Sequence, residues 1–449
     1  YYWIGGTGNW SDGNNWSATS GGAPLGCLPG IPDNVIFDAA SGLSAATTVT
    51  MDVPVVVNIF DFSTAPAFVL TSALPSIEIR GHLSGNGLVT FAGWAGDINL
   101  NSAGSNILTS NGTAWMQSFH FTGVGTVIIA DNLTTTLDFY VDLGSVISNN
   151  NTLTFRDFYS NIVALRVINF DNSVINFEGT TWDVDPTSYT WTSSPSTIFT
   201  NNTTVVSFTG GNQIYDTIRS MATELQINNS NTFSLLSLAA VSQLTLENGS
   251  LQSIDSLYTT GSCGTRTSIV SAIPAPVASA EILKIGFPDF SANYLSIENV
   301  DAMSPGSETY SIAQSDTTNG ADGWSLTGRP FYWIGDAGSW SDGNNWSNVS
   351  GGAPIGCIPS RVDSVFFDAA SFSTGGQTVL IDLQGEFKTM DWTGTTGNQT
   401  LALDSNLMSF GDVIFVSNLS VLRNLSISGI QFNNQALLFP NSSTIDCSF

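Results

Sequence analysis

Basic residues are scarce in this chain. Of its 449 residues, 10 are Lys or Arg and 36 are Asp or Glu, which gives a formal net charge of -26. Nucleic-acid binding depends on Lys and Arg that neutralise phosphates, and anionic membrane surfaces attract the same side chains. We therefore expect neither of them as a partner. An acidic surface favours solubility and is compatible with divalent cations or basic partners.

Long apolar runs and common catalytic motifs are also missing. No stretch of about 18 consecutive apolar residues occurs, so we expect no direct membrane insertion. The two histidines, His82 and His120, lie in strand-like segments, and no Gly-x-Ser-x-Gly motif is present to carry a nucleophile. No Cys-x-x-Cys pair indicates a zinc site. Nucleophilic and zinc-dependent catalysis are therefore not expected.

Paired carboxylates keep one enzymatic alternative open. Asp183 and Asp185 are separated by a single residue, which would place both on one face of a strand, and Asp138 and Asp142 would also share a face. Such pairs occur in β-helix enzymes that degrade polysaccharides. Those enzymes often need basic groups as well, and this chain has few. We therefore expect a protein that is not an enzyme.

Helical periodicity is nearly absent, whereas short apolar or alternating segments recur between turn-forming residues. The segments predicted to be strands are 55–60, 67–70, 76–80, 88–91, 97–100, 126–129, 137–141, 152–155, 165–170 and 174–177. Antiparallel sandwiches would favour two-residue Asn-Gly or Asp-Gly hairpins, but here polar corners follow the strands at irregular intervals. Asn149 to Asn151, Asn201-Asn202 and Asn228-Asn229 suit such corners because Asn tolerates left-handed backbone. The sequence predicts an all-β parallel β-helix (β-solenoid), with tandem antiparallel β-sandwiches as the alternative.

One segment of the chain occurs twice, and the two copies align without a break in register. Tyr2 corresponds to Tyr332, and between Tyr2 and Ser41, 28 of 40 positions are identical to those of the later copy. A long-period repeat is typical of an array. We predict a Trp-rich cap or junction module at 1–42, a solenoid body at 43–329, a second such module at 330–372 and the start of a second body at 373–449. This organisation fits either a piece of a longer array or a protomer whose second unit is short.

The repeated segment resembles a known family. Trp3-Ile4-Gly5, Trp10-Ser11-Asp12, Asn15-Trp16-Ser17 and Val35 to Asp38 resemble the module that opens repeats in very large secreted surface proteins of Bacteroidota. The segment from Tyr294 to Ala302 resembles the closing coils of the same repeats. The resemblance covers both ends of the first unit and the start of the second.

This resemblance implies an adhesin or cell-surface filament, exported by the type IX secretion route. We accordingly expect an extracellular structural or adhesive protein that forms a long stalk or filament. Its partners would be neighbouring repeat units or identical chains. The alternative is a module that binds surface polysaccharide.

Two features of the Trp-rich module allow a binding interpretation. Trp3, Trp10 and Trp16 suit a cover over the open end of a coil stack, but Trp side chains can also form a platform for carbohydrate. Short-spaced oxygen ligands suggest calcium, against the simpler interpretation of an Asx turn. The calcium candidates are Asp12 and Asn14, with their counterparts Asp342 and Asn344, and with Asp33 and Asp38 as more distant contributors. No other cofactor is expected.

Four cysteines, Cys27, Cys263, Cys357 and Cys447, permit three pairings in an oxidising compartment. Cys27 and Cys357 occupy equivalent positions, so a bond between them would be unusual. A Cys263–Cys357 bond would link neighbouring units, and Cys27–Cys263 is its competitor.

Asp-Ser or Asp-Thr followed by a small apolar residue or Thr resembles the O-glycosylation signal of exported Bacteroidota proteins. The candidate acceptors are Thr217, Ser256, Thr317 and Ser364.

Overall fold

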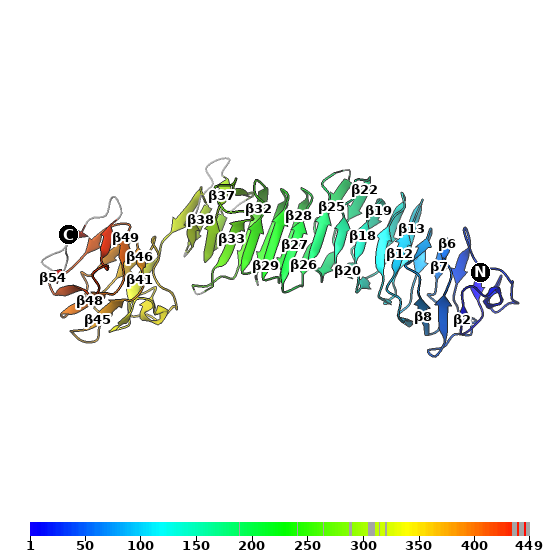
Figure 1. Ribbon diagram of the computed structural model, residues 1–449, viewed down its shortest axis with the longest axis horizontal. Coiled ribbons are helices and arrows are strands. Elements are labelled where there is room, and N and C mark those ends of the chain that lie inside the picture. Colours follow the sequence, from blue (N-terminus) through cyan, green and yellow to red (C-terminus); the bar gives the residue numbers. More distant parts are fainter. Residues whose placement is uncertain are drawn as a thin grey trace. The chain divides into compact units, whose positions relative to one another are not determined.

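The structure is a computed structural model that describes residues 1–187, 189–239, 241–263, 265–286, 290–303, 310–313, 315–318, 321–432, 438–439 and 444–445. In these residues the regular elements are strands (Figure 1), apart from two one-turn 3-10 helices, η1 (Gly13–Asn15) and η2 (Gly343–Asn345). The chain forms two compact units. Unit 1 comprises Tyr1–Tyr258, Ser271–Ile273 and Ala280–Ile285, and unit 2 comprises Thr259–Val270, Pro274–Ser279 and Gly286–Phe449.

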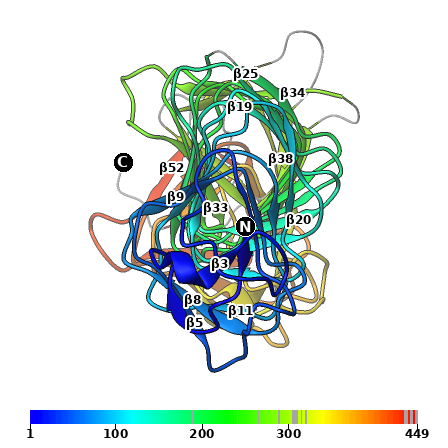
Figure 2. The same ribbon diagram turned by 90° about the vertical axis from the view of Figure 1, so that its right-hand side faces the viewer.

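Unit 1 is a stack of coils whose strands lie in parallel sheets; Figure 2 shows the coils one behind another. The first sheet is, in spatial order, β25 (Tyr189–Thr192), β22 (Arg166–Asn169), β19 (Gly144–Ile147), β16 (Thr126–Ile129), β13 (Ser105–Thr109), β10 (Leu83–Ser84), β7 (Ile59–Asp61), β4 (Asn34–Ile36), β1 (Tyr2–Trp3) and β3 (Trp16–Ser17). The second contains β31 (Gln243–Leu246), β29 (Glu224–Asn228), β27 (Val205–Thr209), β24 (Thr181–Val184), β21 (Phe158–Ser160), β18 (Phe139–Val141), β15 (Ser118–Phe121), β12 (Asp97–Leu100), β9 (Ser76–Ile79) and β6 (Val56–Val57).

Two further sheets close the coils of unit 1. One contains β14 (Ala114–Trp115), β17 (Leu133–Thr135), β20 (Thr152–Phe155), β23 (Val174–Phe177), β26 (Thr197–Thr200), β28 (Ile214–Ser220), β30 (Thr232–Leu238), β32 (Leu251–Thr259) and β34 (Ala280–Lys284). The other, among the first coils, contains β11 (Val89–Phe91), β8 (Phe68–Ser72), β5 (Thr48–Met51) and β2 (Gly8–Asn9).

Unit 2 has the same construction. Its first part contains β33 (Thr267–Ser271), β36 (Leu295–Glu298) and β39 (Asp316–Thr318), then β35 (Phe290–Asn293), β38 (Tyr310–Ala313) and β40 (Trp324–Thr327), and also β37 (Val300–Met303). The sheets that follow contain β43 (Trp346–Ser347), β41 (Pro330–Trp333), β44 (Ser364–Phe366), β47 (Thr389–Asp391), β50 (Val413–Ile414) and β53 (Leu438–Phe439); β42 (Gly338–Ser339), β45 (Thr378–Ile381), β48 (Gln399–Leu403), β51 (Leu419–Arg423) and β54 (Thr444–Ile445); and β46 (Gly385–Phe387), β49 (Leu407–Ser409) and β52 (Ile430–Phe432).

The β-solenoid prediction is confirmed. Among the described strand pairs, the antiparallel ones are β1–β3 and β41–β43, which belong to the two copies of the Trp-rich module. A tandem sandwich would instead be built from antiparallel neighbours. In the second sheet of unit 1, Asn99 pairs with Glu78 of the preceding coil and with His120 of the following one, so these two coils are equally long. The coil that separates Val205 from its partner Glu224 is shorter.

In many of the short strands every second side chain points inward, and these side chains fill the interior of the coils. Strands such as β9, β12, β16 and β20 alternate half-buried and buried side chains. Aromatic rings then stack from coil to coil: Trp182 lies 4.2 Å from Phe158 and 5.4 Å from Phe208, centroid to centroid. Burial of such side chains is the main favourable contribution to folding, at about 25 cal/mol per Å² of apolar area.

The corners of the coils use asparagine where the backbone is left-handed. Asn149, Asn150 and Asn229 have φ values of 55°, 62° and 65°. Asn tolerates this region better than other non-glycine residues because its short polar side chain can bond locally. Asn202, at another expected corner, accepts the N–H of Thr204 in an Asx turn, without positive φ.

The compact units do not divide where the sequence repeat does. The repeat suggests a boundary at 329/330, whereas residues 286–329 belong with the second copy of the module in unit 2. A disulfide and two arginines, described below, connect residues of unit 2 that precede this boundary to that module.

Candidate functional site

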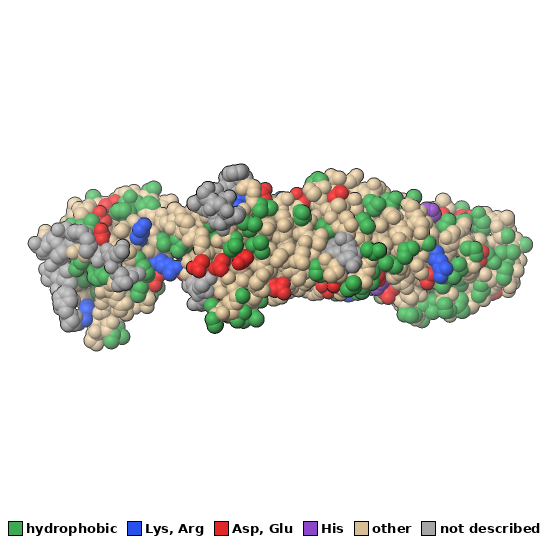
Figure 3. All heavy atoms as spheres, turned by 90° about the horizontal axis from the view of Figure 1, so that it is seen from above, with side chains coloured by type: hydrophobic (Ala, Val, Ile, Leu, Met, Phe, Trp, Pro, Cys, Tyr) green, Lys and Arg blue, Asp and Glu red, His purple; other side chains and the backbone are tan. Residues whose placement is uncertain are grey.

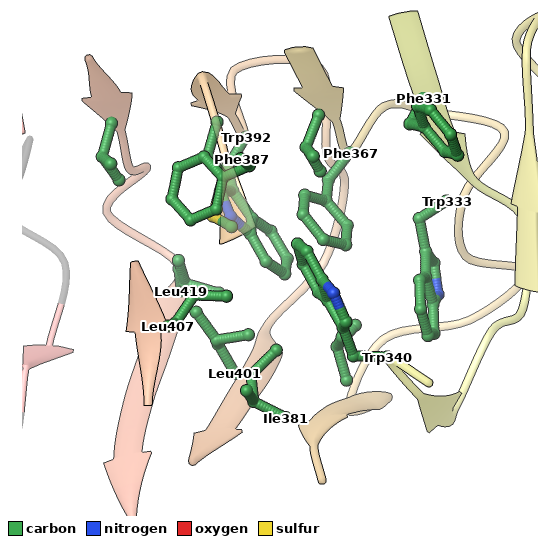
Figure 4. Packing of buried hydrophobic residues seen from close by; sticks show 14 of the residues in the cluster. Phe331, Trp333, Trp340, Phe367, Ile381, Phe387, Trp392, Leu401, Leu407 and Leu419 are labelled. Atoms are coloured by element: carbon green, nitrogen blue, oxygen red, sulfur yellow. The ribbon is translucent and has the colours of Figure 1, made fainter. Parts of the chain in front are cut away.

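The two copies of the Trp-rich module, called here the first Trp module (1–42) and the second Trp module (330–372), have the same core. In the first, Trp16 packs edge-on against Trp3 at 5.0 Å and against Trp10 at 4.7 Å. In the second, Trp346 lies at the same distances from Trp333 and Trp340. Figure 4 shows the second module with Trp333, Trp340 and Phe367 gathered in its interior.

These tryptophans are interior side chains. Trp3, Trp10 and Trp16 are at most 1 % exposed. The indole N–H of Trp16 donates to the carbonyl of Trp10 at 2.9 Å, and that of Trp3 donates to Gly6 at 3.0 Å. The module therefore offers none of these three rings as a carbohydrate platform. The antiparallel strand β3 occupies the edge of its sheet, which fits the expected capping role because it covers backbone groups that would otherwise be unpaired.

The calcium candidates form local turns. The Asp12 carboxylate caps η1 and accepts from the backbone N–H of Asn14 at 2.9 Å and from its side-chain amide at 3.0 Å. Asp342 and Asn344 repeat this arrangement. Asp33 accepts from the N–H of Gly30, and Asp38 from that of Ala40. In the described part of the chain, no three His, Cys, Asp or Glu side chains are grouped to hold a metal ion.

A disulfide joins the second Trp module to the strands that precede it within unit 2. It links Cys263 and Cys357, whose Cα atoms are 5.0 Å apart and whose sequence separation is 94 residues. This is one of the pairings that the sequence left open. Cys27 carries an exposed free thiol, and Cys447 lies outside the described residues.

Two arginines strengthen the same junction. The Arg329 guanidinium lies 3.6 and 3.5 Å from the sulfurs of Cys263 and Cys357 and 4.8 Å from the centre of the Phe331 ring. Burial lowers the pKa of Arg329. Arg361, in the second Trp module, donates to the carbonyl of Thr317 at 2.5 Å and forms an ion pair with Asp316 at 3.2 Å. These contacts position the module on the coils that precede it.

A small cavity of about 230 Å³ lies beside this disulfide. Its lining includes Arg266, Arg329, Asp316, Asp363 and Glu386. The Nε atoms of both arginines are buried without a hydrogen-bond partner. Because the lining mixes carboxylates with guanidinium groups, the cavity does not favour a ligand of one charge.

The clearest polar row on unit 1 runs along the outer face of its second sheet. The His120 and Tyr140 rings stack at 4.0 Å and 9°, and those of Tyr140 and Tyr159 at 4.8 Å and 14°. His120 lies 3.2 Å from a carboxylate oxygen of Asp142 and 3.7 Å from one of Asp97. The sequence alone did not reveal this row.

Arg156 anchors the row from one side. Its Nε and Nη2 atoms donate to Asp138 at 2.7 and 2.6 Å, and the Tyr140 hydroxyl donates to the same carboxylate at 3.2 Å. Burial, with the Asp138 charge, raises the pKa of Tyr140. A sugar stacks on an exposed ring face, but the Tyr140 ring is stacked between His120 of the preceding coil and Tyr159 of the following one. The row therefore resembles a stacking ladder between coils more than a sugar platform.

Asp183 and Asp185 lie on the same outward face, as their spacing predicts, but the members of each carboxylate pair have separate partners. Asp138 and Asp142 have different partners, Arg156 and His120. Asp183 accepts from the amide of Asn161 at 2.8 Å, and Asp185 accepts from Thr187. These hydrogen bonds and ion pairs hold each of the four carboxylates to a neighbouring side chain or backbone group.

The glycosylation candidates lie on strands at different depths. Ser256 on β32 is exposed, whereas Thr217 on β28, Thr317 on β39 and Ser364 on β44 are half-buried. Thr317 also accepts from Arg361 at its hydroxyl, at 3.1 Å. Ser256 is therefore the most accessible of the four hydroxyls.

Comparisons of the chain with protein families, with curated proteins and with solved structures find no match. In the described residues no helix is long and apolar enough to cross a membrane.

Proposed function

We propose that this protein is an extracellular structural or adhesive repeat protein whose coils build a long stalk or filament at the cell surface. The observation that carries the proposal is the second Trp module, which is attached to the strands before it by the Cys263–Cys357 disulfide and by Arg361. The same module also opens the chain. A repeated junction of this kind suits a linear array of units.

The packing supports a mechanical role. Neighbouring coils of unit 1 are joined at once by hydrogen bonds in several parallel sheets and by interior ring stacks. Each backbone hydrogen bond contributes about 0.5–1.5 kcal/mol net, but pulling two coils apart along the stack breaks all of them together. Such a stack resists tension better than strands that separate one bond at a time.

The surface and the net charge of the chain support the proposed extracellular location. The face seen in Figure 3 is mostly uncharged, with few Lys and Arg side chains. A net charge of -26 favours repulsion between neighbouring molecules and so opposes lateral aggregation. The same proposal includes export by the type IX route and membership of the Bacteroidota surface-protein family. It also includes O-glycosylation, for which Ser256 is the most accessible candidate.

The two alternatives draw less support. A polysaccharide-binding module needs exposed aromatic faces, but 11 of the 12 tryptophans are buried and Trp324 is half-buried. A polysaccharide-degrading enzyme needs convergent carboxylates, and the predicted pairs have separate partners. The binding-module alternative predicts that purified surface polysaccharide retains the protein in affinity electrophoresis. The enzyme alternative predicts that the protein releases reducing sugar from that polysaccharide.

The proposal is tested on native, untruncated material at the cell surface by electron microscopy with antibodies raised against residues 1–449. Labelled fibres or rods are the expected result. Label on isolated globular particles, together with retention by surface polysaccharide, would replace the filament proposal with the binding-module alternative.

A further inference from the structure

The chain contains the same module in two different surroundings. The Trp cores agree closely: Trp10–Trp16 and Trp340–Trp346 are both 4.7 Å apart, and both Asp-capped turns have the same hydrogen bonds. A difference in exposure between equivalent surfaces therefore reflects what covers them, because the modules themselves are alike.

In the second Trp module one surface is occupied. Cys357 is 4 % exposed and bonded to Cys263. Beside it, Ile355 and Ile358 are partly buried against the same hydrophobic cluster that Cys263 and Tyr294 contact. The residues that cover this surface belong to the strands and loops that close the preceding repeat, here called the closing coils (residues 259–329).

In the first Trp module the equivalent surface is bare. Its members are the counterparts of Ile355, Cys357, Ile358 and Arg361, and we call them the Cys27 surface: Leu25, Cys27, Leu28 and Ile31. Leu25, Leu28 and Ile31 are 41 %, 39 % and 51 % exposed, and Cys27 is an exposed free thiol. A group of exposed apolar side chains often marks an interaction site, whereas single exposed apolar side chains are common on protein surfaces. The thiol also contacts the Tyr1 hydroxyl at 3.4 Å, and this hydrogen bond raises the pKa of Tyr1 to about 12.

We propose that the Cys27 surface docks onto the closing coils of a further repeat unit, and that Cys27 forms a disulfide with that unit's counterpart of Cys263. This inference rests on the proposed array function and adds the way in which units connect. The occupant is fixed by the second module, where closing coils of this kind already cover the equivalent surface. The Cys263 of this chain is already bonded to Cys357, so the counterpart of Cys263 that would bond Cys27 belongs to another unit.

The redox step is a simple oxidation. Two thiols, Cys27 and the partner cysteine, lose two protons and two electrons and form one S–S bond. A disulfide oxidant of the extracellular compartment accepts the electrons and becomes two thiols.

One contact at the docked Cys27 surface would differ from the equivalent contact of the second Trp module. Arg361 pairs with Asp316, whereas its counterpart Ile31 is apolar and cannot form an ion pair. Docking at the first module would therefore rely on apolar contact and the disulfide. This predicts that it depends less on salt than the junction at the second module.

The test uses a longer tandem chain in which residues 1–329 are duplicated ahead of Tyr1, so that a complete unit precedes the existing one. After oxidative refolding with a glutathione pair, free thiols are alkylated with iodoacetamide and the peptides are mapped by mass spectrometry. We expect the second copy of Cys27 to lose its labelling and to appear in a peptide linked to the first copy of Cys263. The first copy of Cys27, which has no unit before it, should be labelled fully and serves as internal reference.

The matched control replaces Cys263 by Ser in the added copy only. Labelling of the second Cys27 should return, while the Cys263–Cys357 link of the original sequence still forms and reports correct folding. The proposal is overturned if the second Cys27 is labelled as completely as the first while that link is intact. If the long tandem does not fold, a second fusion that adds only residues 43–329 repeats the measurement without a third Trp module.

Failure here is distinct from failure of the array function. Fibres at the cell surface together with a fully labelled second Cys27 would leave the filament proposal standing and remove only this linkage. If Cys27 is protected from labelling but the native material forms no fibres, the linkage would stand and the filament proposal would be removed.

Discussion

Replacement of Trp182 tests whether interior ring stacks hold the coils together. Trp182 is fully buried, and its ring lies between Phe158 at 4.2 Å and Phe208 at 5.4 Å. The backbone ladders keep neighbouring coils about 4.8 Å apart, so the coils cannot close over a missing ring. Trp182→Ala should therefore create a cavity and lower the free energy of unfolding of unit 1 by about 3–5 kcal/mol.

The indole nitrogen of the same residue supplies the control. Trp182 Nε1 is buried without a hydrogen-bond partner, and an unsatisfied buried donor costs about 1–3 kcal/mol. Trp182→Phe removes that donor and keeps an aromatic ring between Phe158 and Phe208, while it loses some buried volume. The two effects oppose each other, and we expect a net change of about 1 kcal/mol or less.

Both variants are measured by urea unfolding followed by circular dichroism and by hydrogen exchange read by mass spectrometry. For Trp182→Ala, protection should fall first in β21, β24 and β27 and remain unchanged in the second Trp module, because stability in a stacked array depends on nearest neighbours. Equal losses for the Ala and Phe variants would refute the stacking argument. So would a loss for Trp182→Ala of less than about 1 kcal/mol.

Replacement of both Cys263 and Cys357 by Ser opens a 94-residue loop and should destabilise unit 2 by about 2–5 kcal/mol in urea unfolding; equal stability with and without reductant would contradict this. Asn150 has φ 62°, so Asn150→Ala should cost about 1 kcal/mol in the same assay and Asn150→Gly close to nothing; the opposite order would exclude the left-handed corner. The hydroxyl and N–H of Thr187 hold the pKa of Asp185 below its ordinary value of 3.8, so Thr187→Val should raise it in a carboxyl NMR titration. Because a depressed folded pKa stabilises the protein above the unfolded pKa, the stability difference between Thr187→Val and the parent should be present at neutral pH and disappear as pH falls through the folded pKa of Asp185; an unchanged pKa would contradict the assignment.

Much of the fold could be predicted from local sequence. Period-two alternation located strands such as β9, β12, β16 and β23 closely, because one face of each is buried in the coil interior. Asparagine pairs located left-handed corners at Asn150 and Asn229. The predicted strand 55–60 is two strands, β6 and β7, because the chain turns a corner at Asn58, whose side chain bonds to Asn34 at 2.8 Å.

Contacts between coils could not be predicted in the same way. His120, Tyr140 and Tyr159 lie on three successive coils, and because the coils differ in length, no fixed period in the sequence brings these residues together. A search for aromatic residues spaced by roughly one coil could have suggested the row. The choice among cysteine pairings likewise depends on which coil faces the second Trp module. The spacing of Trp3, Trp10 and Trp16 did not indicate whether their rings are covered.

The most direct test of the central claim is electron cryomicroscopy of native surface material with computed diffraction of the images. A filament built of these coils should give a layer line at about 4.8 Å along its axis, the spacing of adjacent strands, together with a longer period set by the repeated unit. Isolated globular particles, or filaments without the strand-spacing layer line, would contradict the proposal that stacked coils of this protein form a stalk or filament.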